Sequence, residues 1–499
     1  MSNRKSDWIP EPGQGRTFLL LMALGAFLRF FRIGQQSFWA DEVTSLWAAG
    51  SRGASLAEGL SETFHGPLHF LVLSLWSKIG GFGEVWSRSL SAITGLLALW
   101  AIYLLARRLA GSRVALYSLF LLAISPLHVW YSQEVRNYSQ LFLFALLSMI
   151  FFLRILDRGG WKNWLLFLLL SLAGFFSNLA MAFLIAFQAL WLLIQKPRLA
   201  KKLLLALALL LILLLPWFSQ LEIGWRPDMV GKAGVVRNVN FHPLAIPYTL
   251  VVYSVGDTIG PSRNEMNRAL SADLFRPFLY YFAAAGLVFV SLFLLGLRER
   301  WKKPEGAMFF LLWLLVPMLL VALLAFLNVK AYNVRYAWLG MPAYLILLAS
   351  AIASGPARWR WAFLIAISVL SFFPLTNLYG NSRYWKPDAR EAASLLHEKS
   401  REGDLVLVYS ITEPLEHYYR GPGDLRGLDW AMPSTDTFRE RFAEFEKNYE
   451  RVWLVDYRAW YMDPAGEIPK TFEQSWSLSE VFRVPGIEIR FLQGRKEKE

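Results

Sequence analysis

The 499-residue sequence contains no cysteine and little charge. The absence of cysteine excludes disulfides, thiolate catalysis and cysteine-based metal sites, and it leaves the redox compartment unspecified. Only 18% of the residues are charged, whereas an ordinary globular domain has about 25%. By contrast, 55% of the residues are hydrophobic and the mean hydropathy is +0.36. The composition therefore indicates an integral membrane protein.

Apolar runs close to the roughly 20 residues that cross a bilayer recur along the chain. We predict eleven membrane-spanning helices, near residues 17–33, 89–106, 113–127, 138–154, 162–178, 180–195, 202–218, 279–297, 307–327, 337–353 and 359–376. The first run lacks a small-residue cleavage site, so we interpret it as a retained helix and not as a signal peptide.

The basic residues predict the orientation of these spans. The net charge is +13, and the basic residues gather in short loops between apolar runs, at 107–113, 154–162, 196–202, 298–303 and 358–360. The positive-inside rule places such loops, together with the N-terminus, in the cytoplasm. We therefore attribute the basic charge to membrane topology and not to nucleic-acid binding.

The run from Pro67 to Ile79 is apolar but has only about two-thirds of the length that a span requires. If it crossed the membrane, the following basic loops would face outward. We therefore expect a juxtamembrane helix in the outer interface. With this assignment the segments 34–88, 128–137, 219–278 and 328–336 and the tail after 377 face outward.

The tail has a different composition, with many charges and no long apolar run. Residues 388–399 have helical spacing, and residues 405–409, 452–455 and 487–492 have the pattern of strands. The predicted fold class is thus an all-α polytopic membrane protein with about eleven transmembrane helices, a juxtamembrane helix and a small C-terminal α/β extracytoplasmic domain. The predicted domains are residues 1–380 and 381–499.

The chemistry is expected in the outward loops, where acids, cations and aromatic residues gather. Four segments carry these residues: 38–42 (FWADE), 65–69 (HGPLH), 125–138 (SPLHVWYSQEVRNY) and 330–336 (KAYNVRY). An acid can accept the proton of an attacking hydroxyl group, and arginine or lysine can stabilise a phosphate leaving group. Such loops suit a phosphorylated lipid and a hydroxyl acceptor.

A structural interpretation competes with this functional one. Acids that follow a span are often simply solvated, and tryptophan and tyrosine commonly form belts at membrane interfaces. His65 and His69 have the i, i+4 spacing of a metal pair, but no acidic third ligand is adjacent, so packing is the expected role of His69.

Taken together, the four segments resemble a known family. The order is an Asp-Glu pair in the first outer loop, an HxPLxxL-like segment, a basic turn, an SPxHxxYSQExRxYS block and a late Arg-Tyr before an apolar span. This order resembles the GT-C superfamily of membrane glycosyltransferases, near the bacterial aminoarabinose transferases of lipid A and the protein O-mannosyltransferases. The resemblance covers residues 17–376, and the tail lies outside it. A WWDYG-type motif is absent, which argues against transfer of a whole glycan to asparagine.

The resemblance implies an inverting transferase that takes a sugar from a polyprenyl phosphate carrier at the outer face of the cytoplasmic (inner) membrane. Asp41 matches the family's catalytic acid, Glu42 is its neighbour, and Glu134 lies where the family has a second acid. Arg335 and Lys330 are candidates for holding the phosphate, and His65 lies where some members have a lysine that contacts the carrier. The candidate substrate-binding residues are His65, His69, Tyr131, Gln133, Arg136, Tyr138, Lys330, Arg335 and Tyr336.

Several alternatives remain at this point. A flippase of lipid-linked sugars would have a similar number of spans, but transporters tend to carry ionisable residues inside the membrane, and none of the eleven predicted spans contains an acid. A scaffold for envelope assembly is a third possibility. The expected partners are the carrier-linked sugar, membrane lipid and a lipid, glycan or protein acceptor. No cofactor is certain, and a divalent cation is possible but not required.

Overall fold

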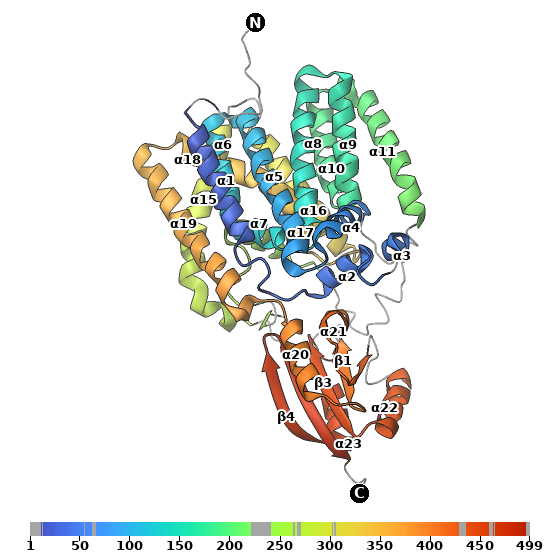
Figure 1. The fold of residues 1–499 in the computed structure, drawn as a ribbon. Helices are drawn as coiled ribbons and strands as arrows, with labels where there is room; N and C mark the ends of the chain where they lie inside the picture. Colours follow the sequence, from blue (N-terminus) through green and yellow to red (C-terminus); the bar gives the residue numbers. More distant parts are fainter. Residues whose placement is uncertain are drawn as a thin grey trace.

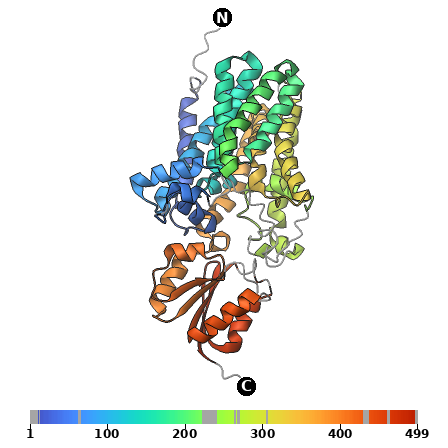
Figure 2. The same cartoon turned by 90° about the vertical axis from the view of Figure 1, so that its right-hand side faces the viewer.

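The computed structural model describes most of the chain. The described residues are 11, 13–53, 55–61, 66–220, 241–262, 265–266, 271–301, 303, 306–428, 436–458, 463 and 465–495. A bundle of helices forms the larger part, and a sheet domain lies at one end of it (Figures 1 and 2).

The bundle is built from helices that are apolar on nearly every face, as expected for segments surrounded by lipid or by other helices. They are α1 (Gly15–Phe30), α5 (Glu84–Ala110), α6 (Ser112–Ala123), α7 (Pro126–Ser132), α8 (Tyr138–Arg158), α9 (Trp161–Ser177), α10 (Met181–Gln195), α11 (Ala200–Gln220), α15 (Leu279–Arg300), α16 (Ala307–Phe326), α17 (Val334–Ala337), α18 (Met341–Ser354) and α19 (Ala357–Gly380). Among the described residues, seven helical segments are long and apolar enough to cross a membrane, and the bent pair α6–α7 would make an eighth.

The predicted number of eleven spans is not confirmed, although a helix coincides with every predicted segment. Helices α1, α9 and α10 have only 16, 17 and 15 residues, and at about 1.5 Å per residue they fall short of a bilayer core of about 30 Å. The segment 113–127 is not one straight helix either. It bends by 62° between α6 and α7, because Ser125 caps α7 and Pro126 occupies its first turn.

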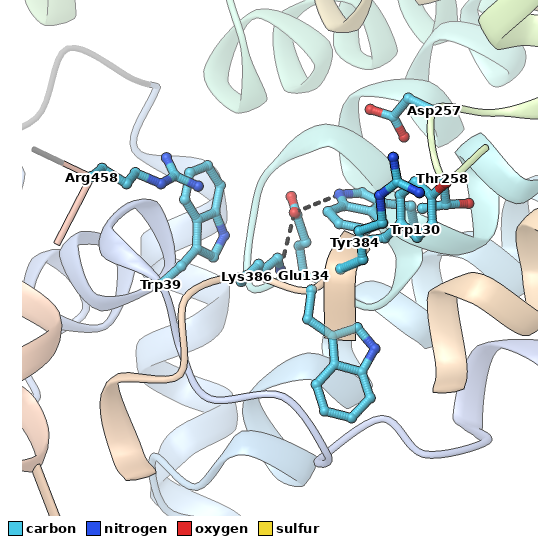
Figure 3. Close-up of a pocket in the computed structure, with 10 residues that line it drawn as sticks. Trp39, Trp130, Glu134, Asp257, Thr258, Tyr384, Lys386 and Arg458 are labelled. Carbon is cyan, nitrogen blue, oxygen red and sulfur yellow. Dashed lines mark hydrogen bonds and ion pairs between the residues drawn. The ribbon is translucent and has the colours of Figure 1, made fainter. Parts of the chain in front are cut away.

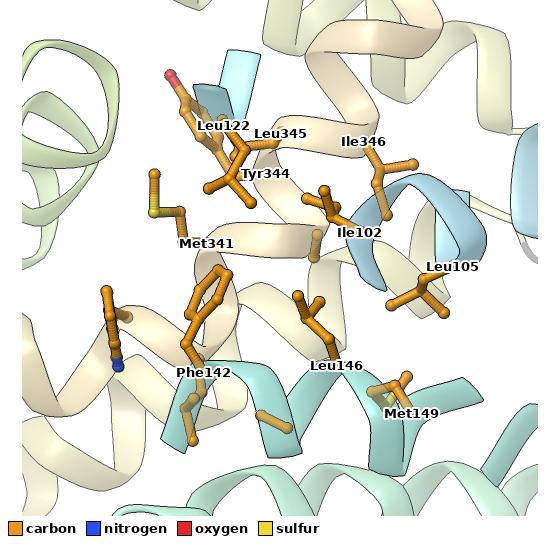
Figure 4. Packing of buried hydrophobic residues seen from close by; sticks show 14 of the residues in the cluster. Ile102, Leu105, Leu122, Phe142, Leu146, Met149, Met341, Tyr344, Leu345 and Ile346 are labelled. Atoms are coloured by element: carbon orange, nitrogen blue, oxygen red, sulfur yellow. The ribbon is translucent and has the colours of Figure 1, made fainter. Parts of the chain in front are cut away.

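The bundle core gathers around α18, every residue of which is buried from Met341 to Ile352. Side chains of α5, α6 and α8 pack against it, among them Ile102, Leu122 and Phe142 (Figure 4). The loops that connect the helices at the end of the bundle nearest the sheet domain carry the candidate site (Figure 1).

Three short helices, α2 (Ala40–Ala48), α3 (Leu56–Ser61) and α4 (Leu68–Gly80), lie at the bundle end nearest the sheet domain (Figures 1 and 2). Helix α4 has 13 residues, which is too short to cross a bilayer. It folds back on α5, because Trp76 and Trp86 stack with ring centroids 4.7 Å apart. The chain can reverse there because Gly81 adopts φ +77°. A further helix, α13 (Ala245–Val255), packs beside α7 and α15 and was not predicted.

The C-terminal part contains a five-stranded sheet of order β2-β1-β3-β5-β4. Its strands are β1 (Leu405–Ser410), β2 (Asp424–Gly427), β3 (Arg451–Tyr457), β4 (Trp476–Val484) and β5 (Ile487–Arg495), and its helices are α20 (Ala389–Lys399), α21 (Glu413–Tyr418), α22 (Asp436–Asn448) and α23 (Glu467–Ser475). β1 runs parallel to β2 and β3, whereas β5 is antiparallel to β3 and β4. The predicted helix at 388–399 and the three predicted strands are present.

Alternating residues of the central strands face two separate cores. Val406 and Val408 pack with α20 and α21, whereas Leu405 and Leu407 pack with α22 and α23. Figure 2 shows the sheet between these two pairs of helices. Both faces of the sheet are therefore covered, as in other α/β domains.

The sheet domain is attached to the segment between α1 and α5 by specific hydrogen bonds. The Ser37 hydroxyl donates to the Pro387 carbonyl over 3.2 Å and accepts from the Ala389 N–H over 3.1 Å. The Tyr418 hydroxyl accepts from the Phe38 N–H over 2.7 Å and donates to Glu84 over 2.8 Å. These bonds flank Trp39–Glu42, so the two parts of the molecule together position the candidate site.

Candidate functional site

Asp41 lies in the first turn of α2, and its side chain is one-third exposed. Its Oδ2 lies 3.4 Å from Nη1 of Arg335 and 4.0 Å from Nη2 of Arg136. Arg335 follows Asn333, whose side chain caps α17, and Arg136 comes from the loop before α8. Three segments distant in the sequence thus place one accessible carboxylate between two guanidinium groups.

Aromatic rings and backbone contacts hold these two arginines. Arg136 donates to the Asp41 carbonyl over 2.9 Å and to the Ser45 hydroxyl over 3.0 Å. The ring of Tyr138 lies 5.8 Å from the Arg136 guanidinium and 5.6 Å from that of Arg335. Arg335 also donates to the Tyr336 hydroxyl over 3.2 Å. These ring contacts and hydrogen bonds hold both guanidinium groups in place next to Asp41.

Glu42 has a different environment from its neighbour. It is fully buried, and Arg88 donates to its two carboxylate oxygens over 2.8 Å each. Lys386 lies 3.4 Å from Oε2, and the Val135 N–H donates to Oε1 over 2.9 Å. Burial acts to raise the pKa of Glu42, but the charges of Arg88 and Lys386 and these hydrogen bonds outweigh it and lower the pKa to about 2. Glu42 is therefore an ionised carboxylate that joins α2 to α5 and to the sheet domain.

Glu134 is also buried, at 2% exposure, and follows α7. Its Oε1 accepts from Trp130 Nε1 over 2.7 Å and lies 3.0 Å from Lys386 Nζ. Its Oε2 is buried and has no hydrogen-bond partner among the described residues. Lys386 thus lies between two buried carboxylates, Glu42 on α2 and Glu134 between α7 and α8.

A cavity that is partly open to solvent lies beside Glu134, where the loops of the bundle meet the sheet domain. Figure 3 shows Glu134 between the indole rings of Trp39 and Trp130, with its two interactions to Trp130 and Lys386. The residues around the cavity are Trp39, Trp130, Glu134, Asp257, Thr258, Arg383, Tyr384, Trp385, Lys386 and Arg458. Aromatic walls with a few convergent polar groups are typical of small-molecule sites.

Of the residues that the sequence analysis singled out, the structure brings together Asp41, Arg136, Tyr138, Arg335 and Tyr336. Lys330 is exposed, and its Nζ lies 6.0 Å from the Tyr336 ring, at the edge of this group. His65 falls outside the described residues.

Three other candidates serve packing or capping. Gln133 donates to the carbonyls of Arg29 and Phe31 at the end of α1, and Tyr131 is buried against Trp338. His69 is buried with its Nδ1 3.3 Å from Gln140. Burial and the charge of Arg136 lower the pKa of His69 to about 3, so the ring is neutral.

Four cations near the site were not predicted from the sequence: Arg88, Lys386, Arg383 and Arg458. Arg88 could have been found, since it is a lone cation at the start of an apolar run and such a charge needs a partner. Lys386 could not, because it lies in the tail that the sequence analysis placed outside the resemblance. Among the described residues, no group of three or more His, Asp or Glu side chains could hold a metal ion.

A family model described as dolichyl-phosphate-mannose-protein mannosyltransferase matches residues 64–219. An uncharacterised protein of Aquifex aeolicus (strain VF5) is 26% identical over 163 residues, which cover 27% of this chain and 33% of that protein. The chain thus spans about a third of this curated relative.

Among solved structures, ArnT from Cupriavidus metallidurans in the apo state has a TM-score of 0.60 at 13% identity, with 95% of this chain and 97% of ArnT covered. The same protein bound to undecaprenyl phosphate has a TM-score of 0.61 at 14% identity, with 96% and 98% covered. At this low sequence identity, the comparison shows only that the two folds are alike.

The structural likeness extends over the C-terminal tail, since at most about a twentieth of the chain is left out. The expectation that the tail lies outside the resemblance is therefore wrong. The shared fold and the match to the mannosyltransferase model together show that this membrane protein resembles the GT-C superfamily of membrane glycosyltransferases, near ArnT and the protein mannosyltransferases.

Proposed function

We propose that the protein is an inverting glycosyltransferase that moves a sugar from a polyprenyl phosphate carrier to an acceptor on the outer face of the cytoplasmic membrane. The observation that carries this proposal is the one-third exposed carboxylate of Asp41 between Arg335 and Arg136. The structure of ArnT with undecaprenyl phosphate supports the choice of carrier, since that protein has the same fold. The family match favours a transferase over the flippase alternative.

In the proposed reaction, Asp41 accepts the proton of an acceptor hydroxyl group while the hydroxyl oxygen attacks the anomeric carbon of the sugar. The bond between that carbon and the phosphate oxygen breaks, and the polyprenyl phosphate leaves with the bonding electrons. Arg335 is the main candidate for stabilising the leaving phosphate, with Lys330 beside it, because its side chain is a quarter exposed and its planar donors suit phosphate oxygens.

Glu42 has a supporting role in this proposal. Both of its carboxylate oxygens already accept hydrogen bonds, and its pKa of about 2 makes it a poor proton acceptor. It holds the start of α2 in place, and thereby sets the height and direction of Asp41. Rigid support of this kind is what a catalytic group needs.

We also propose the topology that the basic loops predict. The chain would cross the membrane eleven times with its N-terminus in the cytoplasm, and α4 would lie in the outer interface. Residues 381–499 would then form an extracytoplasmic domain, and residues 1–380 the transferase domain. In this arrangement the end of the bundle that carries Asp41 faces outward, where lipid-linked sugars meet their acceptors.

Mass analysis of the lipid that copurifies with the protein tests the proposed function. We expect a polyprenyl phosphate or its glycosylated form, bound at about one molecule per chain. Native mass spectrometry with added undecaprenyl phosphate gives the same information for a lipid-stripped sample. Purified protein that takes up no polyprenyl phosphate from either source would contradict the proposal.

A further inference from the structure

An open cavity of about 740 Å³ lies at the end of the bundle opposite the sheet domain (Figure 1). Its volume falls within the roughly 300–1,000 Å³ that is usual for small-molecule sites. Four parts of the chain line the cavity: the segment before α1, the turn between α5 and α6, the end of α15 and the end of α18. Because Asp41 and its arginines lie at the other end of the bundle, this cavity is separate from the candidate site.

The cavity lies where membrane-spanning helices end. Three of the seven helical segments that are long and apolar enough to cross a membrane, those that contain α5, α15 and α18, end there. Their last residues, which all line the cavity, are Ala110, Arg300 and Ser354. Trp301, which follows directly, is 71% exposed, and tryptophan is enriched where a membrane meets water. The cavity therefore lies at the level of the phospholipid head groups.

The charges around the cavity favour an anion. The charged side chains that line it are Arg113, Arg300, Lys303, Glu11 and Glu299. Glu11 is already balanced by a cation outside this set, because its Oε1 lies 3.8 Å from Nη2 of Arg107. Arg113 and Lys303 are exposed, so their long side chains can turn toward a ligand. Three cations thus oppose a single acid, Glu299, whose charge Arg107 does not balance.

Arg300 and the start of α6 add fixed donors to these exposed cations. Arg300 is buried, at 6% exposure, and donates from Nη2 to the Leu109 carbonyl over 2.8 Å. Gly111 offers no side-chain cap to α6, and the first hydrogen bond of the helix runs from Ala115 to Gly111. The N–H groups of residues 112–114 therefore have no partner within the helix. All three residues line the cavity, and such helix N-termini bind phosphate and other anions.

We propose that this cavity is a binding site for a phosphate group at the membrane surface. Arg113 and Lys303 would contact the phosphate from the open side, and Arg300 and the first N–H groups of α6 from the wall. The phosphate belongs either to a phospholipid head group or to a soluble phosphate compound. Basic pockets between membrane helices bind lipid head groups, and the position at the ends of three spans favours this source. The inference does not depend on the proposed function.

Native mass spectrometry of the lipid-stripped full-length protein tests this site. The probes are phosphatidylglycerol, diacylglycerol, which has the same acyl chains without the phosphate, and glycerol 1-phosphate, which has the phosphate without the chains. We expect one phosphatidylglycerol molecule to bind more tightly than diacylglycerol. Weaker binding of glycerol 1-phosphate would assign the cavity to a lipid head group, and equal binding would assign it to a soluble phosphate compound.

The double variant Arg113→Ser/Lys303→Ser removes the two exposed cations and should lower the affinity for phosphatidylglycerol by about tenfold or more. The matched control is Arg198→Ser/Lys201→Ser, which removes two exposed cations at the junction of α10 and α11, at the same end of the bundle (Figure 1). It should bind the lipid like the wild type. Glu299→Gln removes the opposing charge, so it should raise the affinity.

The inference is overturned if diacylglycerol binds as well as phosphatidylglycerol, or if neither phosphate compound binds. It is also overturned if Arg113→Ser/Lys303→Ser binds phosphatidylglycerol as tightly as its control. Arg335→Ala should bind this lipid normally, because Arg335 lies beside Asp41 at the other end of the bundle. A loss of binding in Arg335→Ala alone would place the lipid at the candidate site and contradict the inference.

Discussion

At the scale of single residues, Asp41 and Glu42 show how much neighbours in a sequence can differ. Successive residues of a helix point about 100° apart, and here one side chain faces an accessible region while the other is fully buried. The sequence predicts the pair and its place after the first span. It does not predict which member is accessible, because that depends on Arg88, Arg335 and Lys386, which come from distant segments.

We predict that Arg335 contributes directly to the binding of the carrier. Arg335→Ala should weaken the binding of undecaprenyl phosphate by about tenfold or more, because a charge-assisted contact to phosphate is lost. Arg335→Lys should restore binding only in part, since lysine keeps the charge and loses the bidentate fork. Native mass spectrometry or a lipid-binding titration measures the effect.

Arg276→Ala is the control for this series, because Arg276 is a cation on the same proposed side with a side chain that is 78% exposed. It should bind the carrier like the wild type. If Arg335→Ala also binds the carrier normally, Arg335 does not belong to the carrier-binding site.

At the scale of elements, hydrophobic runs predicted the long helices well and the short elements poorly. The eleven apolar segments are helical because each is apolar on nearly every face. Strand β4 was missed because seven of its nine residues are exposed or half-buried at the sheet edge, so its sequence has no clear period. Helix α13 was missed because its apolar run of 11 residues is too short for a span.

The ion pair of Glu42 and Arg88 joins α2 to α5. We predict that its removal destabilises the fold. Glu42→Gln leaves the guanidinium of Arg88 buried without its counter-charge. Loss of one partner of such a buried pair costs about 3–5 kcal/mol of unfolding free energy, and a thermal or denaturant unfolding measurement detects it. Glu416→Gln, which breaks the exposed pair with Arg52, should cost less than about 1 kcal/mol.

The same ion pair should also make the stability of the protein depend on pH. The pKa of Glu42 is lowered from about 4.5 to about 2 in the folded protein. Its stabilising contribution is therefore complete above about pH 4.5 and is lost as the pH falls toward 2. Glu42→Gln lacks this contribution. The difference in unfolding free energy between the variant and the wild type should therefore narrow as the pH falls from about 4.5 toward 2. A difference that is constant from pH 5 to 2 would show that the carboxylate charge does not stabilise the fold.

At the scale of the whole molecule, composition and charge predicted a helical membrane protein with a C-terminal α/β part, and both are present. The connection between the two parts was not predictable. Lys386 lies 344 residues from Glu42 in the sequence and meets it in the structure. No local sequence pattern predicts such a contact. From the sequence alone, the tail was therefore interpreted as a separate unit.

Cysteine labelling tests the proposed topology, and the chain suits it because it has no native cysteine. A cysteine at Gly83, where a side chain meets no atom within 4 Å, and one at exposed Ser479 should both react with a membrane-impermeant reagent in intact cells. A cysteine at Ser354 should react only after permeabilisation. Protection at Gly83 with labelling at Ser354 would reverse the proposed orientation of the bundle.

The most direct test of the proposed reaction is the rate of sugar transfer by Asp41→Asn. The donor in this assay is the natural glycolipid identified from the purified protein. Asparagine preserves the shape of the side chain and removes its proton affinity. We expect the rate to fall by at least about a hundredfold, the low end of general-base contributions, while the variant folds and binds undecaprenyl phosphate like the wild type. Asp273→Asn, at an exposed acid, should transfer sugar normally. An Asp41→Asn protein that transfers sugar at close to the wild-type rate would contradict the assignment of Asp41 as the base.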